Sequence, residues 1–289
     1  MRRVLLAVLA VLLVTGTTTA AASPGIGFDH YVALGDSYTA GPLIPLQRLD
    51  PLGCARSTAN YPSLLAGALH VDSFSDVSCS GADTTNMTQP QNVPLGVNPP
   101  QFAALRADTD LVTVGIGGND SGVFGTLVGT CPGLRSQDPS GNPCQRHFTV
   151  DGVDTIKAEL TTTEKSVEAV LTGIHARAPH AKVLAIGYPR IAPATGYCPA
   201  ILPFADGDYA WLTTIEEALN AAIRTATEVT GDASYVDTFT PSAGHDACAT
   251  GGAAWINGKD TKLLRAAAYH PLPRGMAGLA GVIHRYLTD

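Results

Sequence analysis

The feature that most constrains this chain is a repeated alternation of short β-rich runs with longer segments of helical periodicity. The β-rich runs, each followed by turn residues, are Tyr31–Leu34, Val71–Val77, Leu111–Ile116, Lys182–Gly187 and Ser234–Val236. The segments with helical spacing of apolar residues are Tyr61–Leu69, Asp151–Ala178, Tyr209–Val229 and Gly275–Leu287. Strands that alternate with helices form a parallel sheet covered on both faces. The sequence therefore predicts one α/β domain with a central parallel sheet of about five strands.

The first 22 residues have the organisation of a cleaved export signal. Two arginines are followed by the apolar run Val4–Val14, and Ala20–Ala22 supplies the small residues of a cleavage site. The run is shorter than the roughly 20 apolar residues that cross a bilayer, although an uncleaved anchor is the alternative. We therefore expect a signal peptide over residues 1–22 and a single domain over residues 23–289. The mature protein is expected to be extracellular, without stable membrane insertion.

The composition of the 289-residue chain excludes several classes of protein. Hydrophobic residues make up 45% and charged residues only 15%, which argues against intrinsic disorder. The formal net charge is −7 and no run of basic residues is present, which argues against nucleic-acid binding and against docking on anionic lipid. We therefore expect a globular protein with no nucleic-acid partner. A monomer is expected as well.

The six cysteines argue for three disulfides, because an even number in an exported protein is typical of a disulfide framework. They are not spaced as zinc ligands, and no other metal site is predicted. Many pairings are possible; sequential ones are favoured because short loops close most readily. The expected bridges are Cys54–Cys79, Cys131–Cys144 and Cys198–Cys248. The Pro/Gly/Ser-rich segment 131–144 is expected to be a surface loop closed by its disulfide.

Two polar motifs follow the first and third β-rich runs. Ser37 lies between Gly35 and Gly41 directly after the first run, where a tight turn suits a nucleophile; a helix N-cap serine is the alternative. Asn119 follows two glycines after the third run, and its amide is a good donor to a developing oxyanion. The alternative for Asn119 is an ordinary turn residue.

Two further candidates lie after the second run and before the last helical segment. Gly81 offers a backbone N–H with no side chain in the way, as an oxyanion donor requires, and is otherwise a turn glycine. His270 precedes the last helical segment and has a side chain suited to general-base catalysis, although the chain holds 8 histidines and a surface role is the alternative. The chain contains no zinc-protease, Walker A or complete dinucleotide-binding motif.

Taken together, Ser37, Gly81, Asn119 and His270 match in order the four blocks of the GDSL family of lipases and esterases, also called SGNH hydrolases. The chain resembles this family over nearly all of its mature length, with Tyr38 where the family name has Leu. With its six cysteines and export signal it looks like the secreted actinobacterial lipases and esterases. The resemblance implies a three-layer α/β/α, flavodoxin-like fold.

The resemblance also implies a mechanism that needs no metal or organic cofactor. Ser37 attacks an ester carbonyl while His270 takes its proton, and an acyl-enzyme forms. The Ser37 N–H, the Gly81 N–H and the Asn119 amide stabilise the oxyanion. The lead substrate is a lipid acyl ester. The alternatives are phospholipase action, carbohydrate deacetylation or acyl transfer to a cell-envelope acceptor at the same site, and a non-catalytic secreted binding protein.

The chain departs from the family pattern at the position three residues before the histidine, where the family has Asp and this sequence has Ala267. A backbone carbonyl can replace the carboxylate that orients the imidazole, with less charge stabilisation. We expect the carbonyl of Ala267 or Ala268 to do so, and a bond from Asp237 or Asp260 to His270 would contradict this. His245 is the rival base.

Apolar residues in three loops are candidates for an acyl-binding rim, and local packing is the alternative explanation. These residues are Leu43–Leu46, Val123–Phe124 and Ile201–Phe204.

Overall fold

The structure, a computed structural model, describes residues 27–289; the predicted signal peptide lies outside the described residues. The central sheet has five strands in the order β2-β1-β5-β8-β9. All neighbouring strands run parallel. Their bounds are β1 (His30–Gly35), β2 (Ser73–Asp76), β5 (Leu111–Gly115), β8 (Lys182–Ile186) and β9 (Ser234–Val236). The predicted five-stranded parallel sheet is confirmed.

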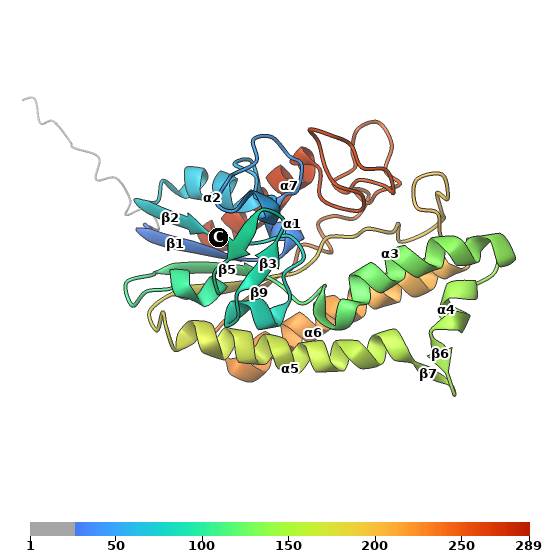
Figure 1. Ribbon diagram of the computed structural model, residues 1–289, viewed down its shortest axis with the longest axis horizontal. Coiled ribbons are helices and arrows are strands. Elements are labelled where there is room, and N and C mark those ends of the chain that lie inside the picture. Colours follow the sequence, from blue (N-terminus) through green and yellow to red (C-terminus); the bar gives the residue numbers. More distant parts are fainter. Residues whose placement is uncertain (1–26) are drawn as a thin grey trace, which may run out of the picture.

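Helices cover both faces of the sheet and form the outer layers of an α/β/α sandwich (Figure 1). On one face lie α2 (Tyr61–Leu69) and α7 (Pro273–Thr288), and on the other α5 (Thr155–His175) and α6 (Asp208–Thr230). Successive residues of a strand point to opposite faces, so Tyr31 and Ala33 pack with α2 and α7. Val32 and Leu34 of the same strand pack with α5 and α6. Both faces are therefore apolar, as a doubly covered parallel sheet requires.

The predicted elements agree closely with the observed ones, with one clear exception at the start of α5. The periodicity predicts a helix from Asp151, whereas α5 begins at Thr155 because the Asp154 side chain caps it, accepting the Lys157 N–H at 3.1 Å. The preceding residues form a short antiparallel hairpin of β6 (Thr149–Val150) and β7 (Val153–Asp154).

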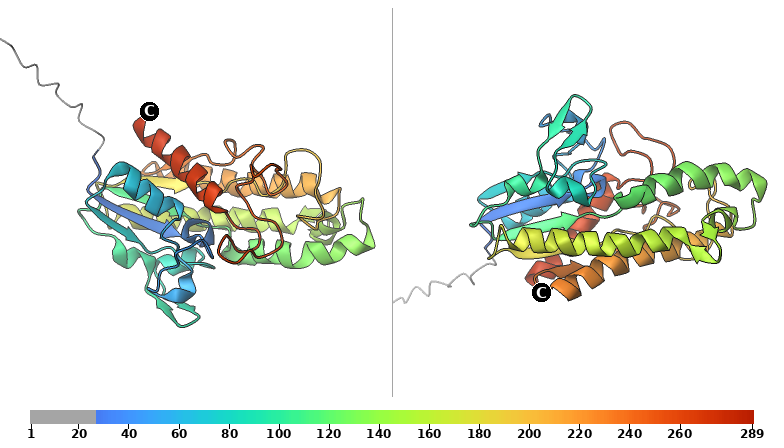
Figure 2. Two further views of the ribbon diagram at one scale, coloured as in Figure 1. Left: turned by 90° about the horizontal axis from the view of Figure 1, so that it is seen from above. Right: turned by 60° about the horizontal axis from the view of Figure 1, so that its bottom comes forward.

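Besides the four-residue helix α1 (Ser37–Ala40), two helices and a second hairpin are absent from the sequence prediction. The helices are α3 (Val123–Leu134) and α4 (Pro143–His147), and the hairpin consists of β3 (Gln91–Val93) and β4 (Gly96–Asn98). The expectation of a loop over residues 131–144 is therefore wrong at both ends, where the chain is helical. Long helices α5 and α6 run together beyond the sheet, and α3 and α4 lie at their far end (Figure 2).

Three disulfides link segments outside the sheet, and they join the pairs that sequential pairing predicts: Cys54–Cys79, Cys131–Cys144 and Cys198–Cys248. The second joins α3 to α4, and the third ties the loop before α6 to the loop before α7. Within residues 27–289, no helix is both long enough and apolar enough to cross a membrane.

The five carboxyl ends of parallel strands meet at one edge of the sheet, where the loops carry the candidate residues. A four-residue helix, α1 (Ser37–Ala40), follows β1, and a 3₁₀ turn, η4 (Asp120–Gly122), follows β5. Another 3₁₀ turn, η2 (Thr84–Met87), follows β2.

Candidate active site

Ser37 is the first residue of α1 and stands on a sharp turn after β1. The Asp36 side chain caps the helix by accepting the Tyr38 N–H at 2.8 Å. Gly35 has φ of 152°, and a Cβ there would lie 2.6 Å from the Gly115 carbonyl oxygen of β5. Glycine is thus required for the turn that presents the Ser37 hydroxyl at the edge of the sheet.

His270 lies in the loop before α7, and its ring bridges Ser37 and the backbone. Its Nε2 is 2.8 Å from the Ser37 Oγ, and its Nδ1 is 2.6 Å from the Ala268 carbonyl oxygen. A carbonyl oxygen only accepts, so Nδ1 carries the proton and the unprotonated Nε2 accepts from the Ser37 hydroxyl. This tautomer is the one that a general base at Nε2 needs.

The backbone that carries the Ala268 carbonyl is held by Asn257, a fully buried side chain. The Asn257 amide donates to the carbonyls of Asp260 at 2.7 Å and Ala267 at 3.0 Å. Its own backbone N–H donates to the His270 carbonyl at 2.9 Å. The loop on both sides of the imidazole is therefore fixed before any substrate binds.

The other two candidate motifs meet at the same edge of the sheet. The Asn119 amide donates to the Ala82 carbonyl at 2.9 Å, directly beside Gly81. The next residue, Asp120, accepts both the backbone N–H of Thr84 at 3.0 Å and its hydroxyl at 2.8 Å. Three hydrogen bonds thus tie the loop after β2 to the loop after β5.

The backbone N–H groups of Ser37 and of Gly81 bond to no acceptor within residues 27–289. Gly81 has φ of 78°, which glycine adopts without strain. The Asn119 amide carries a second N–H that forms no bond in the part of the chain that the structure describes. N–H groups of this kind are the donors that a developing oxyanion requires.

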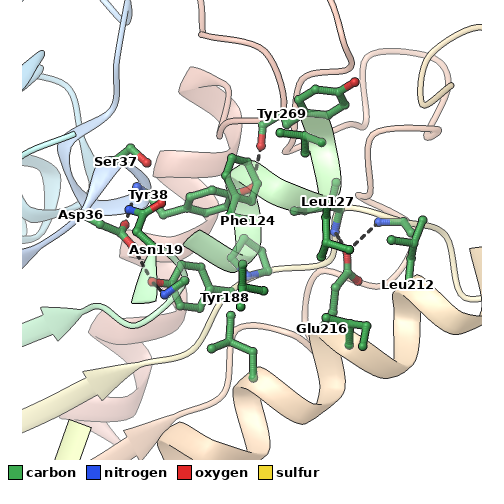
Figure 3. A pocket seen from close by; sticks show the side chains of 18 of the residues that line it. Asp36, Ser37, Tyr38, Asn119, Phe124, Leu127, Tyr188, Leu212, Glu216 and Tyr269 are labelled. Atoms are coloured by element: carbon green, nitrogen blue, oxygen red, sulfur yellow. Dashed lines mark hydrogen bonds between the residues drawn. The ribbon is translucent and has the colours of Figure 1, made fainter. Parts of the chain in front are cut away.

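An apolar pocket opens beside Ser37 and Asn119 and runs toward α6 (Figure 3). Its wall is formed by side chains of α3, of the loop after β8 and of α6. They include Val123, Phe124, Leu127, Tyr188, Ile191, Phe204, Leu212 and Ile215. Of the three apolar clusters in the sequence, Val123–Phe124 and Phe204 line this pocket, whereas no residue of Leu43–Leu46 does.

Comparisons with known proteins identify the family of this chain. Residues 33–277 match the model of the GDSL-like lipase/acylhydrolase family. The chain belongs to this family. Lipase 2 of Streptomyces coelicolor is 42% identical over 253 residues, which are 86% of this chain and 82% of that protein. A lipase of Streptomyces rimosus is 30% identical over 265 residues, 91% of this chain and 88% of that protein.

Solved structures of the GDSL-like family share the fold. Phospholipase A1 from Streptomyces albidoflavus matches with a TM-score of 0.71 at 28% identity, covering 91% of this chain and all 100% of that one. An extracellular lipase from Streptomyces rimosus matches with a TM-score of 0.67 at 28% identity, covering 89% and 99%. As a member of this family with lipase and esterase relatives, the protein is a carboxylic ester hydrolase.

The other candidates from the sequence of this GDSL-like hydrolase lie outside the Ser37–His270 contact. The Nδ1 of His245 forms a hydrogen bond with the Ala253 carbonyl at 2.7 Å, and the His245 ring stacks on Trp255. Asp237 accepts the Phe239 N–H at 2.9 Å, and Asp260 pairs with Lys259. Within residues 27–289, no carboxylate bonds to the His270 ring.

Tyr188, which the sequence prediction does not include, connects the first and third motifs of the GDSL-like site. Its hydroxyl accepts the Gly118 N–H at 3.0 Å and donates to the carboxylate of Asp36. Burial raises the pKa of Asp36 to about 7, and the hydrogen bond from Tyr188 counteracts part of that rise. A single side chain after β8 therefore fixes the distance between the serine turn and the asparagine turn.

Glu216, also absent from the prediction, is a partly buried acid among the mainly apolar side chains of the pocket (Figure 3). One of its oxygens accepts the N–H groups of Ile191 and Ala192, both at 3.0 Å. Burial raises the pKa of Glu216 to about 8. At neutral pH the carboxyl is therefore mostly uncharged, which is compatible with apolar surroundings.

The pH dependence of ester hydrolysis is expected to reflect the burial of His270. The ring lies between Tyr38 and Phe124, with centroid distances of 5.4 and 5.7 Å, and this burial lowers the pKa of His270; the Ala268 carbonyl opposes part of the effect. A base must be neutral, so a lowered pKa keeps it active in more acidic solution. We expect the acid limb of kcat/KM to have its midpoint below 6.5, the ordinary histidine value.

The pH profile is measured with p-nitrophenyl butyrate, and the His270 ring is titrated by NMR in the same buffers. Asp36, next to Ser37, has a pKa of about 7 and could also affect the rate in this pH range. The NMR titration follows the His270 ring alone and so separates its pKa from that of Asp36. An NMR midpoint for His270 at or above 6.5 would contradict the expectation.

Proposed function

We propose that this protein is a secreted serine lipase that hydrolyses lipid acyl esters, with Ser37 as nucleophile and His270 as general base. The observation that carries the proposal is the 2.8 Å contact between the Ser37 Oγ and the His270 Nε2. That contact lies where an apolar pocket begins. A nucleophile, its base and an acyl-binding surface are thus adjacent.

The acylation step follows from these contacts. The Ser37 Oγ attacks the ester carbonyl carbon as its proton passes to Nε2 of His270. The carbonyl oxygen becomes an oxyanion that the Ser37 N–H, the Gly81 N–H and the Asn119 amide stabilise. Collapse of the tetrahedral intermediate breaks the bond to the alcohol, which leaves with the proton from Nε2.

Deacylation reverses the roles with water in place of the alcohol. His270 takes a proton from water, the resulting hydroxide attacks the Ser37 ester, and Nε2 returns the proton to Oγ as the acid leaves. During each step the imidazolium is stabilised by the Ala268 carbonyl dipole at Nδ1 in place of a carboxylate. Ser37 and His270 therefore act as a dyad.

A lipid acyl chain is the substrate group that the pocket favours. Its wall is formed mainly by aliphatic and aromatic side chains, and it holds two acidic residues. Glu216 has a pKa of about 8 that keeps it mostly neutral at pH 7, and Asp36, with a pKa of about 7, accepts a hydrogen bond from Tyr188. Apolar walls bind methylene groups by removing them from water. Phospholipids are included as substrates, because the similar structure from Streptomyces albidoflavus is a phospholipase A1.

Export is part of the proposal. Residues 1–22 would be removed as a signal peptide, and the three disulfides would form in the oxidising environment that follows. The extracellular lipase of Streptomyces rimosus has a similar structure. The mature protein would act as a monomer.

The proposal is tested by hydrolysis of p-nitrophenyl esters from acetate to palmitate, followed by covalent labelling with a p-nitrophenyl alkylphosphonate. We expect the rate to rise from acetate to longer chains, and the phosphonyl group to be found on the Ser37 peptide by mass spectrometry. Activity confined to acetate would favour a deacetylase. Consumption of ester only with an added alcohol acceptor would favour an acyltransferase, and failure of both hydrolysis and labelling would favour a binding protein.

A further inference from the structure

The loop that leads to His270 carries an exposed apolar tip. Leu263 and Leu264 are 78% and 75% exposed, and they lie between two exposed cations, Lys262 and Arg265. The N–H groups of Arg265 and Ala266 both donate to the Lys262 carbonyl at 3.0 Å, which closes a tight turn. Leu264 has φ of 60°, a left-handed conformation that leucine rarely adopts. The backbone therefore holds both leucines in solvent, where they are unfavourable unless a partner covers them.

The base of this tip is anchored to the rest of the site. The Lys259 N–H donates to the Ile201 carbonyl at 2.9 Å, next to the Cys198–Cys248 disulfide. The Ala267 N–H donates to the Pro42 carbonyl at 3.2 Å, on the segment that follows the Ser37 helix. The tip is thus a fixed projection next to the catalytic loop.

A basic cleft of about 630 Å³ adjoins the tip. Its lining includes three cationic side chains, Lys262, Arg265 and Arg274, and no acidic one. Within the part of the chain that the structure describes, none of the three forms an ion pair. The nearby acid Asp260 is paired with Lys259 at 2.9 Å. The fold therefore gathers positive charge here, although the whole chain has a net charge of −7 and no basic run.

We propose that this tip and cleft bind the surface of a lipid aggregate with anionic headgroups. Leu263 and Leu264 enter the apolar layer, while the cations of the cleft bind headgroup phosphates. The choice of lipid as partner rests on the proposed function. The consequence is that His270, on the same loop, is held at the interface where water-insoluble esters lie.

The proposal is tested by co-sedimentation with vesicles of phosphatidylcholine alone or mixed with an equal part of phosphatidylglycerol. Every protein carries Ser37→Ala, so that no lipid is hydrolysed during the measurement. We expect clear binding to the mixed vesicles that weakens with added salt, and much weaker binding to phosphatidylcholine alone. The pair Leu263→Ser and Leu264→Asn should weaken binding at least about ten-fold; asparagine tolerates the left-handed backbone. The pair Lys262→Gln and Arg265→Gln should weaken it about 30-fold at low salt.

The matched control is Val150→Ser with Val153→Ser, two valines of the β6–β7 hairpin that are 54% and 55% exposed. This variant should bind as strongly as the parent. In proteins with an intact Ser37, all three double variants should hydrolyse monomeric p-nitrophenyl butyrate at the wild-type rate, since none of the changed side chains touches Ser37 or His270. That assay reports failure of the proposed function separately from failure of lipid binding.

Three outcomes would overturn the proposal. The first is vesicle binding that neither tip variant weakens, and the second is an equal loss in the valine control. The third is binding of inorganic phosphate in the cleft without binding to either vesicle, which would assign the cleft to a soluble anion.

Discussion

Replacing Ser37 by alanine is expected to lower kcat for p-nitrophenyl butyrate by about 10⁴-fold or more, and replacing His270 by alanine should do the same. The double variant should be no slower than either single variant. The reason is that the Ser37 hydroxyl is a poor nucleophile until Nε2, 2.8 Å away, takes its proton. Groups that act as one unit lose their joint effect when either is removed.

The controls for this expectation are Asp237→Asn and Asp260→Asn. Both carboxylates bond elsewhere, to the backbone N–H of Phe239 and to Lys259, so both variants should keep wild-type activity. Circular dichroism and thermal unfolding verify that every variant is folded. A large loss of kcat in an aspartate variant, or a Ser37→Ala protein that keeps its activity, would contradict the dyad.

The alternation of strand and helix patterns is sufficient to predict the sheet. Each buried strand appears in the sequence as a short continuous apolar run, and each amphipathic helix appears as a longer segment with apolar residues at helical spacing. The predicted strand over Ser234–Val236 and the predicted helix over Tyr61–Leu69 have the observed bounds of β9 and α2. Helix α3 was missed because its sequence contains three glycines and Pro132, all poor helix formers. Its helix is stabilised by tertiary contacts, including the disulfide from Cys131 to Cys144.

The candidate site was predictable where a functional residue belongs to a local motif at the end of a strand. Ser37, Gly81 and Asn119 each follow a strand, and the parallel sheet brings the strand ends together. Tyr188 also directly follows the run Lys182–Gly187, so its place at a strand end could be predicted from the sequence. Its hydrogen bonds to Asp36 and Gly118 are tertiary contacts that the sequence does not predict.

The remaining site residues act through contacts that no sequence spacing encodes. Glu216 lies in the middle of α6, and only the path of the loop after β8 brings Ile191 and Ala192 to its carboxyl. The choice of Ala268 over Ala267 as the carbonyl partner of His270 depends on backbone angles in a loop braced by Asn257. The absence of the family aspartate predicts that a carbonyl is used, and the fold determines which one.

Asn119→Ala is expected to lower kcat for p-nitrophenyl butyrate by about 10²–10³-fold with little change in KM. One N–H of the amide donates to the Ala82 carbonyl at 2.9 Å, and the second forms no bond within residues 27–289, on a side chain that lines the same pocket as Ser37. That second donor is engaged strongly only when the carbonyl oxygen becomes an oxyanion, so its loss affects the transition state more than bound substrate. The isosteric Asn119→Asp should be slower still, because it removes both donors and adds a negative charge.

A boronic acid distinguishes this explanation from a general loosening of the loop after β5. The boronate forms a tetrahedral adduct on Ser37 with an oxygen in the oxyanion position, so its inhibition constant should rise in Asn119→Ala roughly as much as kcat falls. A neutral ketone that binds the apolar pocket without reacting should keep its affinity. If Asn119 only held the Ala82 loop in place, both inhibitors would bind more weakly in Asn119→Ala, and KM would rise as well. A weaker boronic acid with an unchanged ketone requires the amide to bind the developing charge.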